Sequence, residues 1–314
     1  MKTIHRVIYA TDLSDASQGA WEDARRLGKL FDAEIVILHV ATPPPVFLDA
    51  AYASAGIIEE LRANARRDAE TRLDGMLGSI RGSGLKARIR LEEGPAAQRV
   101  LEAVAQEKAD LLIVGTHGRT GVDRFLLGSV ADRLMRQAPC PVLTVPPGRG
   151  SEPRPNIRRI CYATDFSPTA RAAWPLAVAI ATASDAHIDL VHVVFQPVVD
   201  RHLPVESLGQ MAHLLYEQGR AEVERFLEQS TLPRDRVRVH LVQGGAPDER
   251  IVHAATEHAA DLIVMGTHGW SGLPRWLLGS VALHAIQMAP CPVLTVSPVG
   301  VSGSPDTTPI AGRA

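Results

Sequence analysis

The pattern Gly-x-x-Gly-x(9)-Gly-Ser occurs twice in this chain, once in each half. In the first half it consists of Gly115, Gly118, Gly128 and Ser129. Glycines that follow an apolar strand let the backbone take positive φ values and let a ligand approach the main chain. The Gly-Ser pair then opens a helix, whose first amides have no internal partner and therefore attract an anion. The pattern predicts a phosphate-binding loop in each half. In the second half its residues are Gly266, Gly269, Gly279 and Ser280.

A purely structural role for these glycines is the competing interpretation. They would then close tight turns, with the serine acting as the N-cap of the helix that follows. Ser129 and Asp132 do fit a capping box in the first half, but Ser280 has Leu283 at the corresponding position. Capping therefore does not explain why both halves have Gly-Ser, and ligand binding is favoured.

Neither of the two commonest nucleotide-binding fingerprints is present. A P-loop requires G-x-x-x-x-G-K-[ST], and a dinucleotide-binding fold has its glycines after the first strand, whereas this motif follows the fourth apolar run. Because the lysine of a P-loop is missing, the charge of a polyphosphate must be met by backbone amides, the helix dipole and, where one binds, Mg²⁺. Efficient hydrolysis is therefore not expected.

The elements that must position these loops repeat in the same order in each half. Continuous Val/Ile/Leu runs alternate with helical stretches, which predicts a parallel sheet covered on both faces. Right-handed crossovers make each half a doubly wound α/β domain with a five-stranded parallel sheet flanked by helices. The predicted strands are 4–11, 35–40, 87–94, 111–115 and 141–145, then 157–163, 188–193, 237–245, 262–266 and 292–296, and the predicted helices are 15–31, 57–80, 96–108 and 129–138, then 168–183, 205–229, 247–259 and 280–289.

Two segments rich in proline, glycine and serine divide and end the chain. Residues 148–156 read as a linker, because proline and glycine prevent a strand or helix from continuing. The tail 299–314 has almost nothing to bury and is expected to be disordered. The predicted domains are therefore residues 1–147 and 157–298.

The composition limits the classes of partner. A formal net charge of −2 and the lack of a dense Lys/Arg block argue against nucleic acid or an anionic membrane as the main partner. No apolar run reaches the ~20 residues that would span a bilayer, and the N-terminus lacks the layout of a signal peptide. A cytoplasmic protein is expected. The cysteines Cys140, Cys161 and Cys291 are expected to be buried thiols, with a disulfide between Cys140 and Cys291 feasible only if the duplicated strands lie side by side.

Three motifs together resemble the universal stress protein family in its tandem form. They are ATDxS after the first apolar run, the Gly-x-x-Gly-x(9)-Gly-Ser pattern and the closing APCPVLTV, all present in both halves apart from small changes. The resemblance covers residues 4 to 297. It implies a Rossmann-like, adenine nucleotide alpha hydrolase-like fold that binds ATP, with or without Mg²⁺, and acts as a stress-response sensor or regulator.

The resemblance also implies which residues contact the nucleotide, from the ends of the first, second and fourth strands and from the start of the last helix. In the first half these are Ala10, Asp12, Val40, Val114, Gly115, His117, Gly118, Gly128, Ser129 and Val130. In the second half they are Ala163, Asp165, Val193, Met265, Gly266, His268, Gly269, Gly279, Ser280 and Val281.

The aspartates have a case of their own, because ligands of open α/β sheets bind at the carboxyl ends of the strands, where a carboxylate can accept protons from ribose hydroxyls. Capping of the following helix is the alternative for Asp12, and it is compatible with binding. His117 and His268 are expected to contact phosphate rather than to catalyse, since no base partner is evident. In the second half Trp270 and Pro274 replace Arg119 and Asp123, so the two sites are expected to differ at their rims.

Two other functions remain open from the sequence. One is a slow ATPase or autophosphorylating enzyme that uses the motif histidines or Ser129 and Ser280. The other is an interaction scaffold with nucleotide-free sites. Since a short apolar strand at a sheet edge needs covering, residues 141–145 and 292–296 are expected to pair antiparallel about a pseudo-twofold axis. One chain would then resemble a dimer of single-domain relatives. A homodimer of the whole chain and an unidentified regulatory partner are both compatible with the sequence.

Overall fold

The computed structural model describes residues 4–41, 55–116, 127–147, 156–194, 205–269 and 278–298. Each half alternates strands with helices, and the second half adds one short 3-10 turn before its third strand. The first half contains β1 (Arg6–Thr11), α1 (Asp15–Phe31), β2 (Glu34–Ala41), α2 (Ala55–Ser79), β3 (Lys86–Glu93), α3 (Ala96–Glu107), β4 (Leu111–Gly115), α4 (Ser129–Gln137) and β5 (Val142–Val145). The second half contains β6 (Arg159–Ala163), α5 (Pro168–Ser184), β7 (His187–Val194), α6 (Val205–Glu228), η1 (Arg234–Arg236), β8 (Val237–Gln243), α7 (Pro247–Glu257), β9 (Leu262–Gly266), α8 (Ser280–Met288) and β10 (Val293–Val296).

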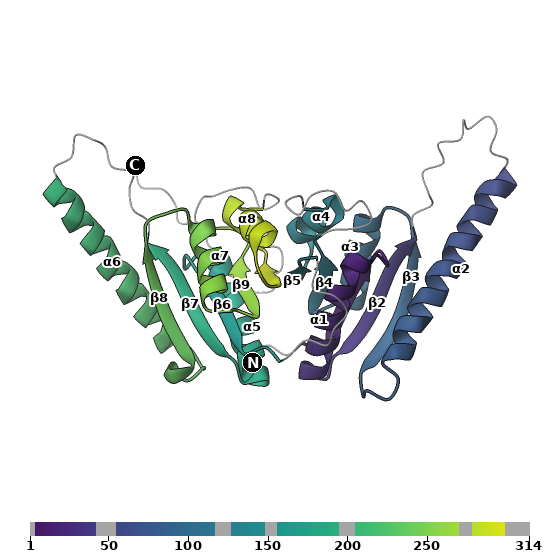
Figure 1. Ribbon diagram of the computed structural model, residues 1–314, viewed down its shortest axis with the longest axis horizontal. Helices are drawn as coiled ribbons and strands as arrows, with labels where there is room; N and C mark the ends of the chain where they lie inside the picture. The colour runs from purple at the N-terminus through teal and green to yellow at the C-terminus, as the bar shows by residue number, and fades with distance from the viewer. Residues whose placement is uncertain are drawn as a thin grey trace.

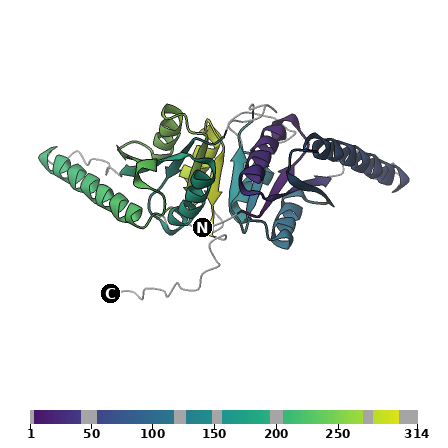
Figure 2. The same ribbon diagram turned by 90° about the horizontal axis from the view of Figure 1, so that it is seen from below.

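The strands form one sheet in the order β3-β2-β1-β4-β5-β10-β9-β6-β7-β8. Within each half all neighbouring strands are parallel, so the predicted five-stranded, doubly wound fold is confirmed. The two five-stranded sheets are continuous with each other rather than separate. The long helices α2 and α6 lie at the two far ends of the molecule (Figures 1 and 2). None of the helices in the described ranges combines the length and apolar character needed to cross a bilayer.

The core has two layers because successive strand residues point to opposite faces of the sheet. On one face, Val7 and Tyr9 of β1 belong to a core layer that contains side chains of α1 and α2 and, in the second half, of α5 and α6. On the other face, Ile8 and Ala10 belong to a layer that contains side chains of α3 and α4 and, in the second half, of α7 and α8. Helix α1 buries Ala20, Ala24 and Leu27, which are spaced so that they share one side of the helix. Both faces are therefore covered, and ligands can approach only from an edge of the sheet.

The two halves join where the last strands meet. Strand β10 pairs antiparallel with β5, in the register that places Leu294 opposite Leu143. Two buried threonine hydroxyls add bonds across the junction: Thr144 donates to the Val293 carbonyl (3.1 Å) and Thr295 to the Val142 carbonyl (3.3 Å). The pairing covers both strand edges, which is the reason for expecting it from the sequence.

The cysteines remain thiols although the duplicated strands lie side by side. Cys140, Cys161 and Cys291 are all buried, and no disulfide bond is recorded among the described residues. Burial raises the pKa of the Cys161 thiol far above its usual value, with smaller contributions from Cys291 and Asp189. The expectation of small buried thiols is confirmed.

Replacing Thr144 with valine is expected to lower the free energy of unfolding by about 1 kcal/mol. Valine keeps the shape of the side chain but leaves the buried Val293 carbonyl without this bond. The urea midpoint of the full chain measures the change. Thr71→Val in α2, whose hydroxyl makes an exposed bond to the Arg67 carbonyl, is the matched control and should change the midpoint much less. Equal shifts would contradict a special role for the junction.

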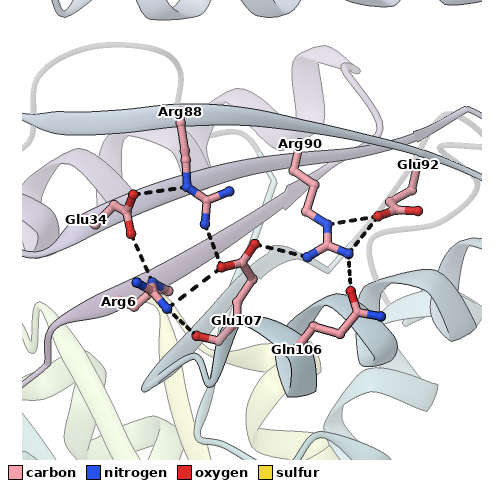
Figure 3. A network of polar contacts seen from close by, with 7 residues as sticks. All are labelled: Arg6, Glu34, Arg88, Arg90, Glu92, Gln106 and Glu107. Atoms are coloured by element: carbon pink, nitrogen blue, oxygen red, sulfur yellow. Dashed lines mark hydrogen bonds and ion pairs between the residues drawn. The ribbon is translucent and has the colours of Figure 1, made fainter.

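An ion-pair network fixes the outer strands of the first half (Figure 3). Glu34 of β2 lies 2.9 Å from Arg6 and 3.0 Å from Arg88. Glu107, at the end of α3, lies 2.5 Å from Arg88 and 3.0 Å from Arg90. The network therefore ties β1, β2 and β3 to α3. In the second half the outer strands carry a different cluster, in which His240 of β8 lies 2.8 Å from the buried Asp189 of β7.

Candidate functional site

Each half has a cavity at the carboxyl ends of its parallel strands. The first cavity has a volume of about 490 Å³ and lies where β1 and β4 end. The second has a volume of about 320 Å³ and lies where β6 and β9 end. In the first half the order of the strands switches sides between these two neighbours. Strands β1, β2 and β3 follow one another on one side, and β4 and β5 follow on the other. Such switch points are where open α/β sheets bind ligands.

The turn from β1 into α1 is held by buried hydroxyl groups. The Tyr9 hydroxyl donates to the Ser17 carbonyl (2.8 Å), and burial raises the pKa of Tyr9 to about 12, so the phenol stays a neutral donor. Thr11 Oγ1 bonds Ser17 Oγ (2.9 Å) and accepts the Leu13 amide (2.9 Å). Leu13 has a φ of 61°, a left-handed conformation that is costly for a residue with a side chain. The hydroxyl bonds stabilise it and so fix the position of Asp12.

The second half builds the same turn with the same groups. Tyr162 donates to the Ala170 carbonyl (2.7 Å), and the Phe166 amide donates to Thr164 Oγ1 (2.9 Å). Phe166 has a φ of 58°. The sequence difference between Leu13 and Phe166 therefore changes the size of the side chain but not the path of the backbone.

Asp12 and Asp165 both line their cavities and bond to their own turns. Oδ1 of Asp12 accepts the amide (3.0 Å) and the hydroxyl (2.6 Å) of Ser14. Oδ1 of Asp165 accepts the amide of Ser167 (3.0 Å). The helix N-caps are Ser14 and Ser167 themselves, so the aspartates form a turn just before the helix rather than capping it. The alternative that Asp12 is the cap is therefore wrong in detail.

The starts of α4 and α8 also differ from the serine caps of the competing interpretation. The N-cap residues are Gly128 and Gly279, and Ser129 is the first helical residue. In the first half the carboxylate of Asp132 binds Arg136, with Oδ1 2.8 Å from Nη2, so the capping box proposed for Ser129 is wrong. A glycine N-cap has no side chain that could accept hydrogen bonds from the first amides of the helix. The cap therefore does not occupy these amides, which can bind an anion.

Close approach of backbone explains two of the motif glycines, and close approach of a carboxylate explains a third. A Cβ on Gly279 would lie 2.8 Å from the Thr267 carbonyl oxygen, and one on Gly266 would lie 2.7 Å from the Ala170 amide nitrogen. A Cβ on Gly269 would lie 2.5 Å from the Asp165 carboxylate. Each of these contacts is shorter than real side chains make. The glycines bring the strand ends, the helix starts and the aspartate around one cavity.

The loop after β9 is fastened to the start of α5. The His268 carbonyl accepts the hydroxyls of Ser167 (3.1 Å) and Thr169, and the His268 Nδ1 atom lies 2.8 Å from Thr267 Oγ1. The Thr267 amide donates to the Val296 carbonyl (3.0 Å) at the end of β10. The position of this loop is therefore set by three elements at once.

Of the residues expected to bind nucleotide, all those that the structure describes line one of the two cavities. The first cavity brings together Ala10, Asp12, Val40, Val114, Gly115, Gly128, Ser129 and Val130. The second brings together Ala163, Asp165, Val193, Met265, Gly266, His268, Gly269, Gly279, Ser280 and Val281. The remaining two, His117 and Gly118, lie outside the described residues, as do Trp270 and Pro274.

Sequence reasoning missed several residues that line the cavities. Thr116 and Thr267, both buried, lie in the Gly-Thr-His-Gly motif, and their presence in both halves was a signal that could have identified them. Helix α2 contributes Ala65, Asp68 and Ala69 to the first cavity. Nothing in the pattern of α2 marks these residues, because the helix reads as a solvent-facing one.

Comparison with known proteins agrees with this architecture. The model of the universal stress protein family matches residues 3–146 and again residues 156–297. A universal stress protein of Mycolicibacterium smegmatis is 29% identical over 303 residues, which cover 94% of this chain and 98% of that protein. The universal stress protein MJ0531 of Methanocaldococcus jannaschii is 36% identical over 140 residues, covering 45% of this chain and 81% of that protein.

Among solved structures, a universal stress protein from Archaeoglobus fulgidus has a similar fold. Its TM-score is 0.66 at 22% sequence identity, and the alignment covers 94% of this chain and 97% of that one. The likeness extends over both halves and so includes the tandem arrangement. With its two family matches, one in each half, this chain belongs to the universal stress protein family.

Proposed function

We propose that this protein binds ATP and acts as a stress-response sensor or regulator. The observation that carries the proposal is that a glycine-capped helix start and a strand-end aspartate face one cavity. In the first half these are Gly128 at the start of α4 and Asp12 after β1. The helix amides suit an anionic phosphate, and the carboxylate suits the hydroxyl groups of a ribose.

The rest of the first cavity suits an adenine ring. Leu38, Val40 and Val100 give it apolar walls, and backbone groups at the end of β2 can meet the edge of a base. Ligand sites of this kind are mostly apolar with a few placed polar groups. A volume of about 490 Å³ lies within the range of ~300–1,000 Å³ that is usual for small-molecule sites. We assign no catalytic residue, so the proposed action is binding and release.

The junction between the halves supports a proposal about assembly. The β5–β10 pairing would take the place of the contact between two single-domain relatives, so that one chain acts as an intrachain dimer. The buried thiols suit a reducing compartment, and we propose that the protein works in the cytoplasm with a regulatory partner yet to be identified. Analytical ultracentrifugation of the full chain distinguishes a monomer from a further homodimer.

Equilibrium titration with MgATP tests the nucleotide proposal. The native chain is expected to bind saturably, and the double variant Val130→Glu/Val281→Glu is expected to lose at least about tenfold in affinity, because each new carboxylate would face phosphate. Both residues lie in the first turn of a helix, where a glutamate favours the helix dipole, so the variant should fold.

Leu214→Glu is the matched control. It also replaces an apolar helix residue with glutamate, but Leu214 is exposed and lines neither cavity. Its affinity for ATP should equal that of the native chain. No saturable binding by the native chain at millimolar ATP would exclude the proposal.

A further inference from the structure

A third cavity lies between the two halves, where helices α1 and α5 approach each other (Figure 1). It has a volume of about 470 Å³ and is lined by the C-terminal part of α1, by residues just before β3 and β6, and by the end of α5. All of these segments precede the amino ends of strands, whereas the two cavities described above lie at carboxyl ends. We infer that the third cavity binds a small amphipathic anion, whose acidic group contacts cationic residues of α1. This inference is independent of the proposed nucleotide binding.

Helix α1 presents three cationic side chains to this cavity. Arg25, Arg26 and Lys29 all line it, and the spacing of three and four residues places Lys29 on the same side of the helix as the two arginines. Glu22 is the one carboxylate among the lining residues that the structure describes, and it lies 2.9 Å from Arg25. Three cations against one carboxylate leave an excess of two positive charges in the described lining. Guanidinium and ammonium groups bind carboxylates and phosphates through charge-assisted hydrogen bonds.

One of these cations is held in place by a buried ion pair. Arg26 Nη2 lies 2.6 Å from Oδ1 of Asp23, and the two side chains are 10% and 0% exposed. The cost of removing two charges from water offsets much of their attraction, so a buried pair of this kind adds little stability over apolar residues. Even when Asp23 is counted with Glu22 and the three cations, the cluster keeps one net positive charge. The pair therefore positions a guanidinium at the cavity wall without cancelling the positive charge there.

The equivalent helix of the second half, α5, lacks this cluster. Trp21 and Trp174 align the two helices, and Leu176 then stands at the position of Asp23. The positions of the three cations are taken by Val178, Ala179 and Thr182. Leu176 and Ala179 are both buried, so the doubly wound fold accepts apolar residues where α1 has its ion pair. The fold therefore does not require charges at these positions, which favours a binding role for them in α1.

The lining also includes apolar side chains, which indicate the rest of the ligand. Ile157, just before β6, is buried, and Leu30 and Leu85 are half-buried. These side chains cannot bond to an acidic group, but they can remove a hydrocarbon chain from water. A ligand with one acidic group and a short apolar body therefore matches this lining better than a bare inorganic anion does. The volume of about 470 Å³ is in the range usual for small-molecule sites.

Calorimetric titration with n-octyl phosphate tests the inference, because this probe joins a phosphate to a hydrocarbon chain. The titration uses the full chain and its double variant Val130→Glu/Val281→Glu, whose new carboxylates would repel phosphate from the other two cavities. One octyl phosphate is expected to bind the double variant, with the affinity that the third cavity has in the native chain. If the double variant binds none, the third cavity is not a site for this class of ligand.

Two further probes separate the acidic group from the apolar body. In the same double variant, 1-octanol and inorganic phosphate are each expected to bind at least about tenfold more weakly than octyl phosphate, since each lacks one of the two kinds of contact. Equal affinity for octanol would overturn the role of the cations. Equal affinity for inorganic phosphate would overturn the role of the apolar side chains.

Adding Lys29→Glu to the double variant reverses one charge at the cavity. Lys29 is exposed in the last turn of α1 and makes no ion pair with another described residue, so its replacement should leave the fold intact. The affinity for octyl phosphate is expected to fall at least about tenfold, because a carboxylate would face the acidic group. Arg225→Glu is the matched control: Arg225 is also exposed in the last turn of its helix, α6, but does not line the cavity. Equal losses in both variants would mean that the net charge of the chain, and not this cavity, attracts the ligand.

Ser184→Phe tests the same cavity from the second half. Ser184 is the last residue of α5 and lines the cavity, and the last residue of α1 is Phe31, so a phenylalanine suits this helix position. The larger side chain should fill part of the cavity and lower the affinity for octyl phosphate at least about tenfold. If the affinity were unchanged, the ligand would not lie between the halves. Urea midpoints like that of the native chain, measured on the same samples, show that the variants are folded.

Discussion

Replacing Gly266 with alanine is expected to lower the free energy of unfolding by about 3 kcal/mol. The new Cβ would lie 2.7 Å from the Ala170 amide nitrogen and 2.9 Å from the carbonyl carbon of Thr169. Both atoms belong to the backbone at the start of α5, so neither can turn away as a flexible side chain would. Either β9 or α5 must shift, and the second cavity lies between them. The urea midpoint of the full chain measures the loss.

Gly75→Ala is the control with the opposite sign. Gly75 is exposed in the interior of α2, and a Cβ there meets no atom within 4 Å. Alanine favours the helix over glycine by up to about 1 kcal/mol, so this variant should be slightly more stable than the native chain. If Gly266→Ala also raised the midpoint, the close approach of β9 to α5 would not be what requires glycine at this position.

The second large effect concerns Glu107 in the network of Figure 3. Replacing Glu107 with glutamine is expected to lower the free energy of unfolding by about 2 kcal/mol at neutral pH. The side chain of Glu107 is only 13% exposed, and it receives charged hydrogen bonds from Arg88 and Arg90. Glutamine keeps the shape but removes the charge, so each guanidinium group loses one of its carboxylate partners, while Arg88 keeps Glu34 and Arg90 keeps Glu92.

The effect of this variant should depend on pH. The hydrogen bond from Arg88, with a further one from Arg90, outweighs burial and holds the pKa of Glu107 below its ordinary value of 4.5. A carboxylate whose pKa is lower in the folded than in the unfolded chain stabilises the fold above the unfolded value, and this stability is lost as the pH falls through the folded value. The difference between the native chain and Glu107→Gln should therefore be full at pH 7 and shrink below pH 4.5.

Glu102→Gln is the control for the network. Glu102 also lies on α3 and also binds an arginine, Arg99, but both side chains are well exposed to solvent. Exposed pairs contribute little, so this change should hardly move the urea midpoint at any pH. A difference between native chain and Glu107→Gln that stayed constant from pH 7 to pH 3 would show that packing, and not charge, is what Glu107 contributes.

Most of the fold could be predicted because the sequence patterns that specify it are local and occur once in each half. Strand and helix periodicity gave the order of elements in each half, and a parallel sheet places all carboxyl ends at one edge. This is why the described binding candidates, from Ala10 to Val281, lie around two cavities. Whether they bind nucleotide stays a prediction, as does the role of His117 and Gly118.

The errors concern single positions whose outcome depends on backbone geometry. An N-cap role for Ser129 was part of the competing interpretation, but the helix takes Gly128 as its cap and begins at the serine. Asp12 was the alternative cap for α1, and that role belongs to Ser14. Such shifts of one or two residues are not fixed by residue type, because serine, aspartate and glycine all fit the positions around a helix start.

Periodicity and residue type alone specify two doubly wound halves, each with glycines and an aspartate at the carboxyl ends of its strands. The amount of room beside these residues is set by long-range packing. That room depends on how closely α2 approaches β2 and α6 approaches β7, and therefore on the packing of Ala69 in one half and of Gly219 and Phe166 in the other. Contacts between segments distant in the chain leave no periodic signal in either segment, so the unequal cavities became visible only in the folded chain.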